Sequence, residues 1–137
     1  MAGKFPNVSK KLAYLTYKEN IDLLVKLYPA SFNKQFPLPL ELNIHKEITR
    51  KTGWSAEKTS MVLNIWTTRM EYVMMACSTG KRFKLHSVAM KIRSPIDPEP
   101  MAGFSSRLKA FRDRGRVVKF KHDFSYKFGY EAFQFVV

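Results

Sequence analysis

The stretch MEYVMMACSTGKRFKL, residues 70–85, joins the end of an apolar helix to a short basic strand. Gly80 separates the two parts, since glycine readily ends a helix. In an extended strand, Phe83 and Leu85 lie on one face and the cations at positions 82 and 84 on the other. The apolar face is therefore expected to anchor the strand in the core. The basic side chains of the stretch, which suit contacts to phosphate oxygens, are Lys81, Arg82 and Lys84.

The composition favours a polyanionic partner. The chain has 137 residues, of which 45% are hydrophobic and 14% aromatic, enough for a core of its own. Its 24 Lys and Arg outnumber 11 Asp and Glu, for a formal charge of +13. Residues 81–127 hold 13 of the cations and only four acidic side chains, a net +9. This charge indicates nucleic acid first and an acidic membrane surface second, with a merely solvated surface as the remaining explanation.

The sequence predicts no cofactor, metal site or secretion signal. The single cysteine, Cys77, excludes an internal disulfide, and no CxxC pair or histidine cluster offers tetrahedral metal ligands. The N-terminal residues lack the apolar run of a signal peptide, and no segment approaches the ~20 apolar residues of a membrane span. We therefore expect a soluble cytoplasmic protein without cofactors.

The N-terminal third predicts a helix followed by an extended connector. Apolar residues at helical spacing predict a helix that begins with Thr16 as its cap and ends at about Tyr28. Two closely spaced prolines exclude regular helix from residues 30–43. The expected core side chains of this connector are Phe32, Phe36 and Leu40.

Two further helices are expected before the basic strand. A short helix should run from Leu42 to Thr52 and end at Gly53. Ser55 is expected to cap the longest helix of the chain, which continues to about Cys77. Because that helix is apolar on more than one face, we expect it to be central.

After Gly80, the segments KRFKL and VAMKI are expected to be two strands joined by a tight turn at His86 and Ser87. The proline-rich residues 93–103 are expected to form a loop or linker. Residues 104–114 have a helical pattern, whereas the alternation of apolar and charged residues over 116–128 predicts an edge strand or an arm.

Residues 47–66 have the pattern of a helix-turn-helix, with a short helix, a glycine and a capped second helix. The start of the second helix, Ser55 to Lys58, offers unpaired N–H groups beside a cation, which suits a phosphate. The alternative is that Ser55 only caps the helix. The three histidines lie far apart, and the chain contains no nucleophile motif, P-loop or GxGxxG. We therefore do not expect an enzyme.

Four stretches together resemble the FinO/ProQ family of RNA-binding proteins: YPASF at 28–32, PLPLELNIHKEI at 37–48, MEYVMMA at 70–76 and TGKRFKL at 79–85. The family has an aromatic-Pro pair followed by Phe, a Pro-Leu stretch before a helix, a long helix bearing a Tyr, and a Gly-x-Arg hairpin. The resemblance covers residues 16–92. It implies an α+β, predominantly α-helical fold with a long central helix and a small β-hairpin.

With residues 16–92 assigned to the RNA-binding domain, residues 1–15 are expected to be a basic N-terminal arm and residues 93–137 a basic aromatic C-terminal extension. The sequence leaves open whether the extension packs on the domain. The resemblance also implies an RNA chaperone that binds terminator-type stem-loops with single-stranded 3′ tails and promotes the pairing of small or antisense RNAs. By the same resemblance, Tyr72 and Arg82 belong to a concave RNA-binding face, and Ser55 to Lys58 receive the 3′ end. The full set of expected RNA contacts is Tyr72, Arg82, Lys81, Lys84, Ser55, Lys58 and Arg69.

The chain departs from the family at several of its usual RNA contacts. Ser60 and Asn64 lie where members often carry basic residues on the long helix, and Leu38 replaces a basic residue before the Pro-Leu pair. His86 and Ser87 replace the Asp-Gly that follows the hairpin leucine. We expect the basic C-terminal segment to supply other phosphate contacts, namely Arg107, Arg112, Arg114, Arg116, Lys119 and Lys121.

The sequence therefore predicts a monomeric, bacterial RNA chaperone that recognises RNA by shape, with low base specificity. The alternative is a DNA-binding protein of helix-turn-helix or histone-like type, with the long helix and the basic hairpin on duplex DNA. A third interpretation is an adaptor whose aromatic C-terminal segment docks a protein partner or an acidic membrane.

Overall fold

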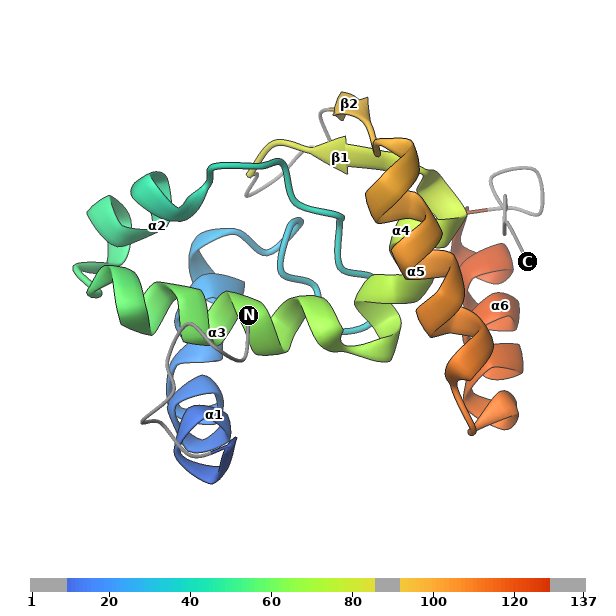
Figure 1. Cartoon of the computed structure of the whole chain (residues 1–137), viewed down its shortest axis with the longest axis horizontal. Coiled ribbons are helices and arrows are strands. Elements are labelled where there is room, and N and C mark those ends of the chain that lie inside the picture. Colours follow the sequence, from blue (N-terminus) through green and yellow to red (C-terminus); the bar gives the residue numbers. More distant parts are fainter. Residues whose placement is uncertain (1–9, 86–91, 129–137) are drawn as a thin grey trace.

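The structure, a computed structural model, describes residues 10–85 and 92–128 (Figure 1). Within these ranges it contains six helices and one two-stranded antiparallel sheet. The elements are α1 (Lys10–Leu27), α2 (His45–Thr52), α3 (Ala56–Thr68), α4 (Met70–Thr79), β1 (Lys81–Phe83), β2 (Ile92–Pro95), α5 (Pro98–Ala110) and α6 (Arg114–Phe128). The predicted class, α+β and predominantly α-helical, is confirmed.

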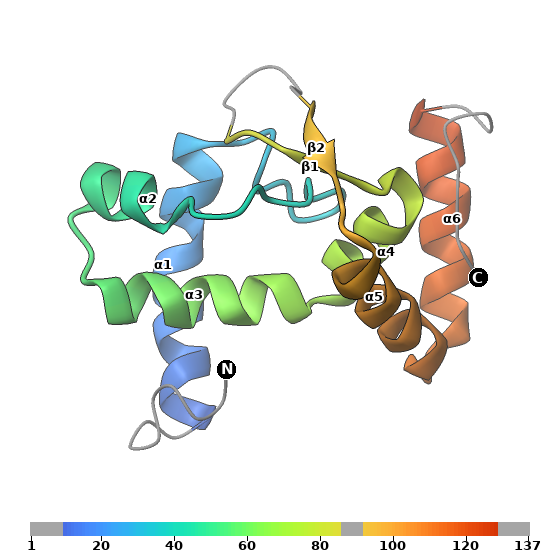
Figure 2. The same cartoon turned by 45° about the horizontal axis from the view of Figure 1, so that its top comes forward.

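Helix α1 has the apolar stripe that the sequence predicts, but it begins earlier. Tyr17, Ile21 and Leu24 are buried on one face, and Figures 1 and 2 show α1 crossing α3. The expected start at Thr16 is wrong, because the helix already begins at Lys10. Good helix formers occupy most of the six preceding positions, so nothing in the sequence stops the helix there.

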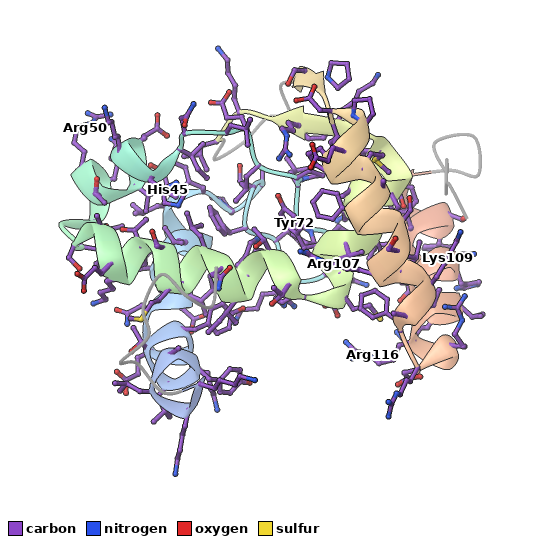
Figure 3. All side chains as sticks on the ribbon, viewed as in Figure 1. His45, Arg50, Tyr72, Arg107, Lys109 and Arg116 are labelled. Atoms are coloured by element: carbon purple, nitrogen blue, oxygen red, sulfur yellow. The ribbon has the colours of Figure 1, made fainter. Side chains whose placement is uncertain are left out.

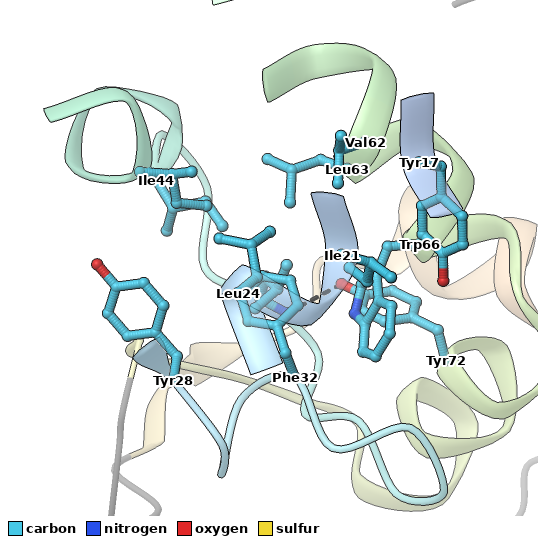
Figure 4. Packing of buried hydrophobic residues seen from close by; sticks show 12 residues of the cluster. Tyr17, Ile21, Leu24, Tyr28, Phe32, Ile44, Val62, Leu63, Trp66 and Tyr72 are labelled. Atoms are coloured by element: carbon cyan, nitrogen blue, oxygen red, sulfur yellow. Dashed lines mark hydrogen bonds between the residues drawn. The ribbon is translucent and has the colours of Figure 1, made fainter. Parts of the chain in front are cut away.

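The connector between α1 and α2 contributes side chains to two core clusters. Phe32, Phe36 and Leu40 are all buried, as predicted. In the first cluster, Phe32 packs against Trp66 of α3 with ring centroids 5.2 Å apart (Figure 4). In the second cluster, Phe36 packs against Phe120 of α6 with centroids 5.4 Å apart. The connector thus joins the helices on both sides of the molecule.

The turn between α2 and α3 has the predicted chemistry. Gly53 has a φ of 75°, which glycine adopts without steric cost, and its N–H donates to the Thr49 carbonyl at 2.9 Å. The Ser55 hydroxyl accepts a hydrogen bond from the Lys58 N–H at 3.1 Å and caps α3. Both expected helix signals are confirmed, although α2 begins at His45, three residues later than predicted.

The predicted long helix is instead two helices. Arg69 separates α3 from α4 in an extended conformation, with φ −63° and ψ 145°. Thr67 and Thr68 each donate their hydroxyl to a carbonyl three residues earlier, at 3.3 and 2.8 Å, so side chains satisfy acceptors at the helix end. The Arg69 guanidinium also donates to the Lys34 carbonyl of the connector at 2.9 Å. These tertiary contacts compensate for a break that no glycine or proline signals in the sequence.

The hairpin is present, and the connector runs along its free edge. The Phe83 N–H donates to the Pro39 carbonyl at 2.8 Å, and the Glu41 N–H donates to the Phe83 carbonyl at 3.1 Å. The second strand is described over Ile92–Pro95, and it includes Ile92, the last residue of the expected strand VAMKI. The other four residues of VAMKI, 88–91, lie outside the described residues. The predicted turn at residues 86–87 lies outside the described residues.

Residues 93–103 are not the expected linker. They complete β2 and begin α5, with Asp97 in the extended conformation of a cap residue. Pro98 and Pro100 lie in the first helical turn, where a missing N–H breaks no intrahelical hydrogen bond. The prolines therefore mark the start of a helix rather than a loop.

Helix α6 replaces the predicted edge strand or arm. Its buried residues Val117, Phe120 and Phe124 are three and four positions apart, which is the helical period. Val118 and Tyr126, which strict alternation would group with the two phenylalanines, are 65% and 90% exposed. The core therefore selects the helical period from a pattern that fits both.

The C-terminal helices pack against the rest of the structure. Figures 1 and 2 show α5 lying along α4, with α6 beside it. Leu108 of α5 and Phe120 and Phe124 of α6 share the second cluster with Val73 and Met74 of α4. The boundaries expected for the three segments of the chain stay a prediction, but residues 98–128 share a core with the hairpin and α4.

Candidate nucleic-acid interface

A pocket of about 320 Å³ lies between α3, α5 and the segment that enters α2. Figure 3 shows His45, Tyr72 and Arg107 around this space. Its charged or aromatic lining residues are Glu41, His45, Tyr72, Arg82, Phe104 and Arg107. Neutral polar groups come from Asn43, Ser60, Asn64, Thr67 and Thr68. The pocket therefore combines two guanidinium groups with hydroxyls and amides that can donate or accept hydrogen bonds.

Tyr72 and Arg82 hold the same residue of the pocket wall. The Leu40 N–H donates to the phenol oxygen of Tyr72 at 2.9 Å, and Nη1 of Arg82 donates to the Leu40 carbonyl at 2.9 Å. Tyr72 is only 2% exposed. Burial raises the pKa of Tyr72, and the phenol is therefore neutral at physiological pH. The side chain forms the floor of the pocket and supports Leu40, rather than presenting its ring to a partner.

The basic strand has the face alternation that the sequence predicts. Phe83 is buried, whereas Lys81 and Lys84 are exposed and Arg82 is half-buried. Leu85 packs against the first core cluster. Arg82 also lines a second hollow of about 520 Å³, which adjoins the first pocket and includes Ser94, Pro95, Asp97 and residues 41–43. The guanidinium of Arg82 thus lies between two openings on this side of the molecule.

Backbone conformation is unusual where the two hollows meet. Asn43 lines both and has a φ of 66°, in the left-handed region. Asparagine tolerates this region better than most residues with a Cβ. The chain therefore makes a sharp local turn at the pocket rim, immediately before α2 begins.

The predicted phosphate cradle lies outside the pocket. Ser55 uses its hydroxyl as a helix cap, and Nζ of Lys58 lies 5.4 Å from the ring centroid of Trp54. Neither Ser55 nor Lys58 lines the pocket, but Ser60, half a turn beyond Lys58 on α3, does. Because residues two apart on a helix do not share a face, Lys58 points to a different side of α3 from the pocket residue Ser60.

Arg69 is part of the framework at the α3–α4 break. Its guanidinium carbon lies 4.6 Å from the ring centroid of Trp66, and Nη2 lies 3.6 Å from Glu71 and donates to the Lys34 carbonyl. The Nη1 atom is buried and has no hydrogen-bond partner among the described residues. Because Arg69 is partly buried and does not line the pocket, its expected RNA contact has no support in its surroundings.

The structure divides the six C-terminal cations into two groups. Arg107 lines the pocket, and its guanidinium carbon lies 5.8 Å from the ring centroid of Phe104. Three of the others have partners elsewhere: Arg114 donates to the Leu108 carbonyl, Arg116 pairs with Glu71 at 3.0 Å, and Lys119 pairs with Asp123 at 3.0 Å. Arg112 and Lys121 are also absent from the pocket lining.

Sequence reasoning missed the aromatic wall of the pocket. Phe104 lies on α5, at the start of the segment expected to be helical, and the sequence assigned neither Phe104 nor His45 to a site. Phe104 and Arg107 are three residues apart, a spacing that places both on one side of a helix. That spacing within the expected helix, residues 104–114, was the available signal for the pair.

Two classes of site have no structural support within the described residues. None of the helices there combines the length and the apolar character needed to cross a bilayer. No group of three or more His, Cys, Asp or Glu side chains in these ranges is placed to hold a metal ion.

A comparison with solved structures identifies the architecture. A crystal structure from Neisseria meningitidis, described as a FinO-like RNA chaperone, superposes with a TM-score of 0.58 over 81% of this chain and 88% of its own. The chain has a FinO-like fold. Sequence identity to that structure is 18%, so the similarity is one of fold alone. No protein-family model matches the sequence, and no curated protein matches it significantly.

Proposed function

We propose that the protein is an RNA chaperone that binds the single-stranded 3′ tail of a stem-loop in the pocket between α3 and α5. The observation that carries this proposal is the pocket itself, with Arg82 and Arg107 on its walls in a chain of charge +13. Its approximate volume of 320 Å³ suits a nucleotide-sized group. The FinO-like fold supports the same function.

The lining groups suit a sugar-phosphate backbone. Arginine binds phosphate oxygens with two parallel hydrogen bonds, and both Arg82 and Arg107 have N–H groups beyond the contacts described above. Asn64, Thr67 and the other neutral polar residues can bond ribose hydroxyls, which distinguish RNA from DNA. Recognition through these groups depends on shape and leaves sequence specificity low.

The adjoining surface is proposed to hold the stem. Lys81 and Lys84 are exposed on the hairpin next to Arg82, and they can contact duplex phosphates while the tail occupies the pocket. Lys58 lies on another side of α3 from the pocket residue Ser60, so we assign it a phosphate outside the pocket. Protein bound in this way contacts backbone, which leaves the loop bases free to pair with a small or antisense RNA.

The cellular setting follows from the same proposal. A chaperone of this kind acts on RNA in the bacterial cytoplasm, and one pocket per chain suffices for a monomer. No catalytic step is assigned to any residue.

Binding to three nucleic acids tests the proposal. The probes are a stem-loop with a U-rich 3′ tail, the same stem-loop with a blocked 3′ end, and a DNA duplex of matched length. We expect tight binding to the first and clear losses for the other two. Equal affinity for all three would mean that only net charge acts, and the proposal would fail.

A pair of variants on α5 supplies the control. Arg107→Ala should weaken binding to the tailed stem-loop, because Arg107 lines the pocket. Lys109 lies two residues further along α5, is exposed and does not line the pocket. Lys109→Ala therefore removes the same charge without changing the pocket. If the two variants weaken binding equally, the tail does not occupy the pocket.

The two other interpretations are less well supported. Helix α3 buries Val62, Leu63 and Trp66, and Lys58 is its one cation, so it offers few phosphate contacts to duplex DNA. Truncation after Lys119 would not separate the adaptor interpretation from the others. It would remove Phe120 and Phe124 from the second core cluster, and would therefore destabilise the fold as well as remove a docking segment.

A further inference from the structure

The wall that α5 contributes to the pocket carries an aromatic ring. Phe104 lines the pocket and is only partly buried. Its ring centroid lies 6.0 Å from that of Tyr72, with the planes tilted by 54°. The guanidinium carbon of Arg107 lies 5.8 Å from the Phe104 centroid. An aromatic ring and a cation therefore occupy the same wall.

The Phe104 ring is held firmly in place. It packs against both core clusters. Tyr72 behind it is 2% exposed and is fixed by its hydrogen bond to Leu40. A rigid ring loses little conformational freedom when a planar ligand stacks on it, so this position is suited to binding.

We propose that Phe104 stacks on an unpaired base of the RNA tail, with Arg107 bonding the adjacent phosphate. The inference rests on the proposed function and adds the chemistry by which the pocket selects single-stranded nucleotides. Every base has a π-face, so such stacking tolerates all sequences. A base within a duplex already stacks on its neighbours and pairs with its partner, so it cannot lie against the Phe104 ring.

This role differs from that of the other pocket residues. Arg82 and the neutral polar groups can hold the backbone whether or not a base is attached to it. Tyr72 is 2% exposed, so Phe104 offers the one partly open phenyl ring among the described lining residues. The exposed His45 imidazole also lines the pocket, at the start of α2, but we assign the stacking to Phe104 because Arg107 lies beside it on the same wall. Removing the bases of the tail should therefore affect binding mainly through Phe104.

The test compares a normal tail with an abasic one. The two RNAs share one stem-loop and differ only in whether the unpaired 3′ nucleotides carry bases. Wild-type protein is expected to bind the abasic tail about tenfold more weakly, which corresponds to stacking of one base. Phe104→Leu keeps an apolar side chain for the core but removes the π-face, and it should lower this ratio towards one. Phe104→Trp should keep the ratio or raise it.

Thermal unfolding of each variant shows whether its fold is intact, and Phe104→Trp keeps the proposal testable if the leucine variant unfolds. Equal binding of the two tails by the wild-type protein overturns the proposal, as does a full tenfold ratio in folded Phe104→Leu. Either result leaves the proposed function standing if the normal tail is still preferred to a DNA duplex. Loss of that preference would instead overturn the proposed function itself.

Discussion

Tyr72→Phe should destabilise the protein by removing one acceptor from its interior. The Leu40 N–H donates to the Tyr72 hydroxyl at 2.9 Å, and the two residues are 5% and 2% exposed. Phenylalanine fills almost the same volume, so the substitution leaves no cavity. The Leu40 N–H, however, loses its acceptor in a place that water reaches poorly.

An unsatisfied buried N–H group costs about 1–3 kcal/mol, and we expect a loss of this size in the free energy of unfolding. Urea denaturation monitored by tryptophan fluorescence measures it, and the m value should be unchanged because the same surface becomes exposed. RNA affinity of the folded variant should change little, since the Tyr72 ring supports Leu40 from inside the core.

Tyr126→Phe is the matched control. The Tyr126 side chain is 90% exposed, so loss of its hydroxyl should leave the free energy of unfolding within about 0.5 kcal/mol of the wild-type value. If Tyr72→Phe is as harmless as Tyr126→Phe, the support assigned to Tyr72 is wrong. A variant that keeps its stability but loses RNA affinity would instead show direct contact between Tyr72 and RNA.

Four further outcomes are expected. Ser55→Ala should lower the free energy of unfolding, measured by urea denaturation, by about 1 kcal/mol, because α3 loses its cap. An unchanged denaturation midpoint would contradict the capping role. Glu71→Ala should lower the free energy of unfolding by roughly 1–3 kcal/mol, because it leaves partly buried Arg69 without its carboxylate partner. Arg116→Ala should lower it by less than about 1 kcal/mol, because Arg116 is mostly exposed. The reverse order would refute this account of the ion pairs around Glu71. Burial raises the pKa of the Cys77 thiol, so less of the reactive thiolate forms at a given pH. Alkylation of Cys77 at pH 8 should therefore be far slower in native than in urea-unfolded protein, and equal rates would be inconsistent with burial. If about six cations neutralise phosphates, RNA affinity should fall roughly a thousandfold between about 50 and 200 mM salt; a shallow titration would count against phosphate binding.

Local chemistry made several features predictable from the sequence. Gly53 and Ser55 act through their own backbone and their near neighbours, so the α2–α3 turn needs no tertiary information. Phe32, Phe36 and Leu40 lie in a segment that its prolines keep out of regular helix, and their large apolar side chains favour burial. The alternation of apolar and charged residues in the basic strand was likewise enough to predict its apolar face.

Features that depend on distant contacts were not predictable. The α3–α4 break needs Arg69 to reach the Lys34 carbonyl, 35 positions earlier in the chain. The α6 pattern fits both a strand and a helix, and only packing of Phe120 against Phe36 selects the helix. Both misassignments came from reading local periodicity without the partner that decides between alternatives.

The candidate site was predictable only in part. Arg82 and Arg107 were expected from charge, and the pocket brings them together. The inward position of Tyr72 follows from its bond to Leu40, a residue 32 positions earlier, and no local pattern encodes that contact. The expected helix, residues 104–114, already contained both Phe104 and Arg107, but its local pattern could not show that this face meets Tyr72 and the pocket.

The position of the RNA tail is the most direct test of the account. A stem-loop carrying a photoreactive thiouridine at the end of its 3′ tail would be crosslinked to the protein, and the attached peptides identified by mass spectrometry. The account predicts attachment within the segments that line the pocket, residues 40–45, 60–68 and 104–107. Attachment confined to α6, Arg114–Phe128, would show that the tail binds the outer basic helix and would contradict the assignment of the pocket.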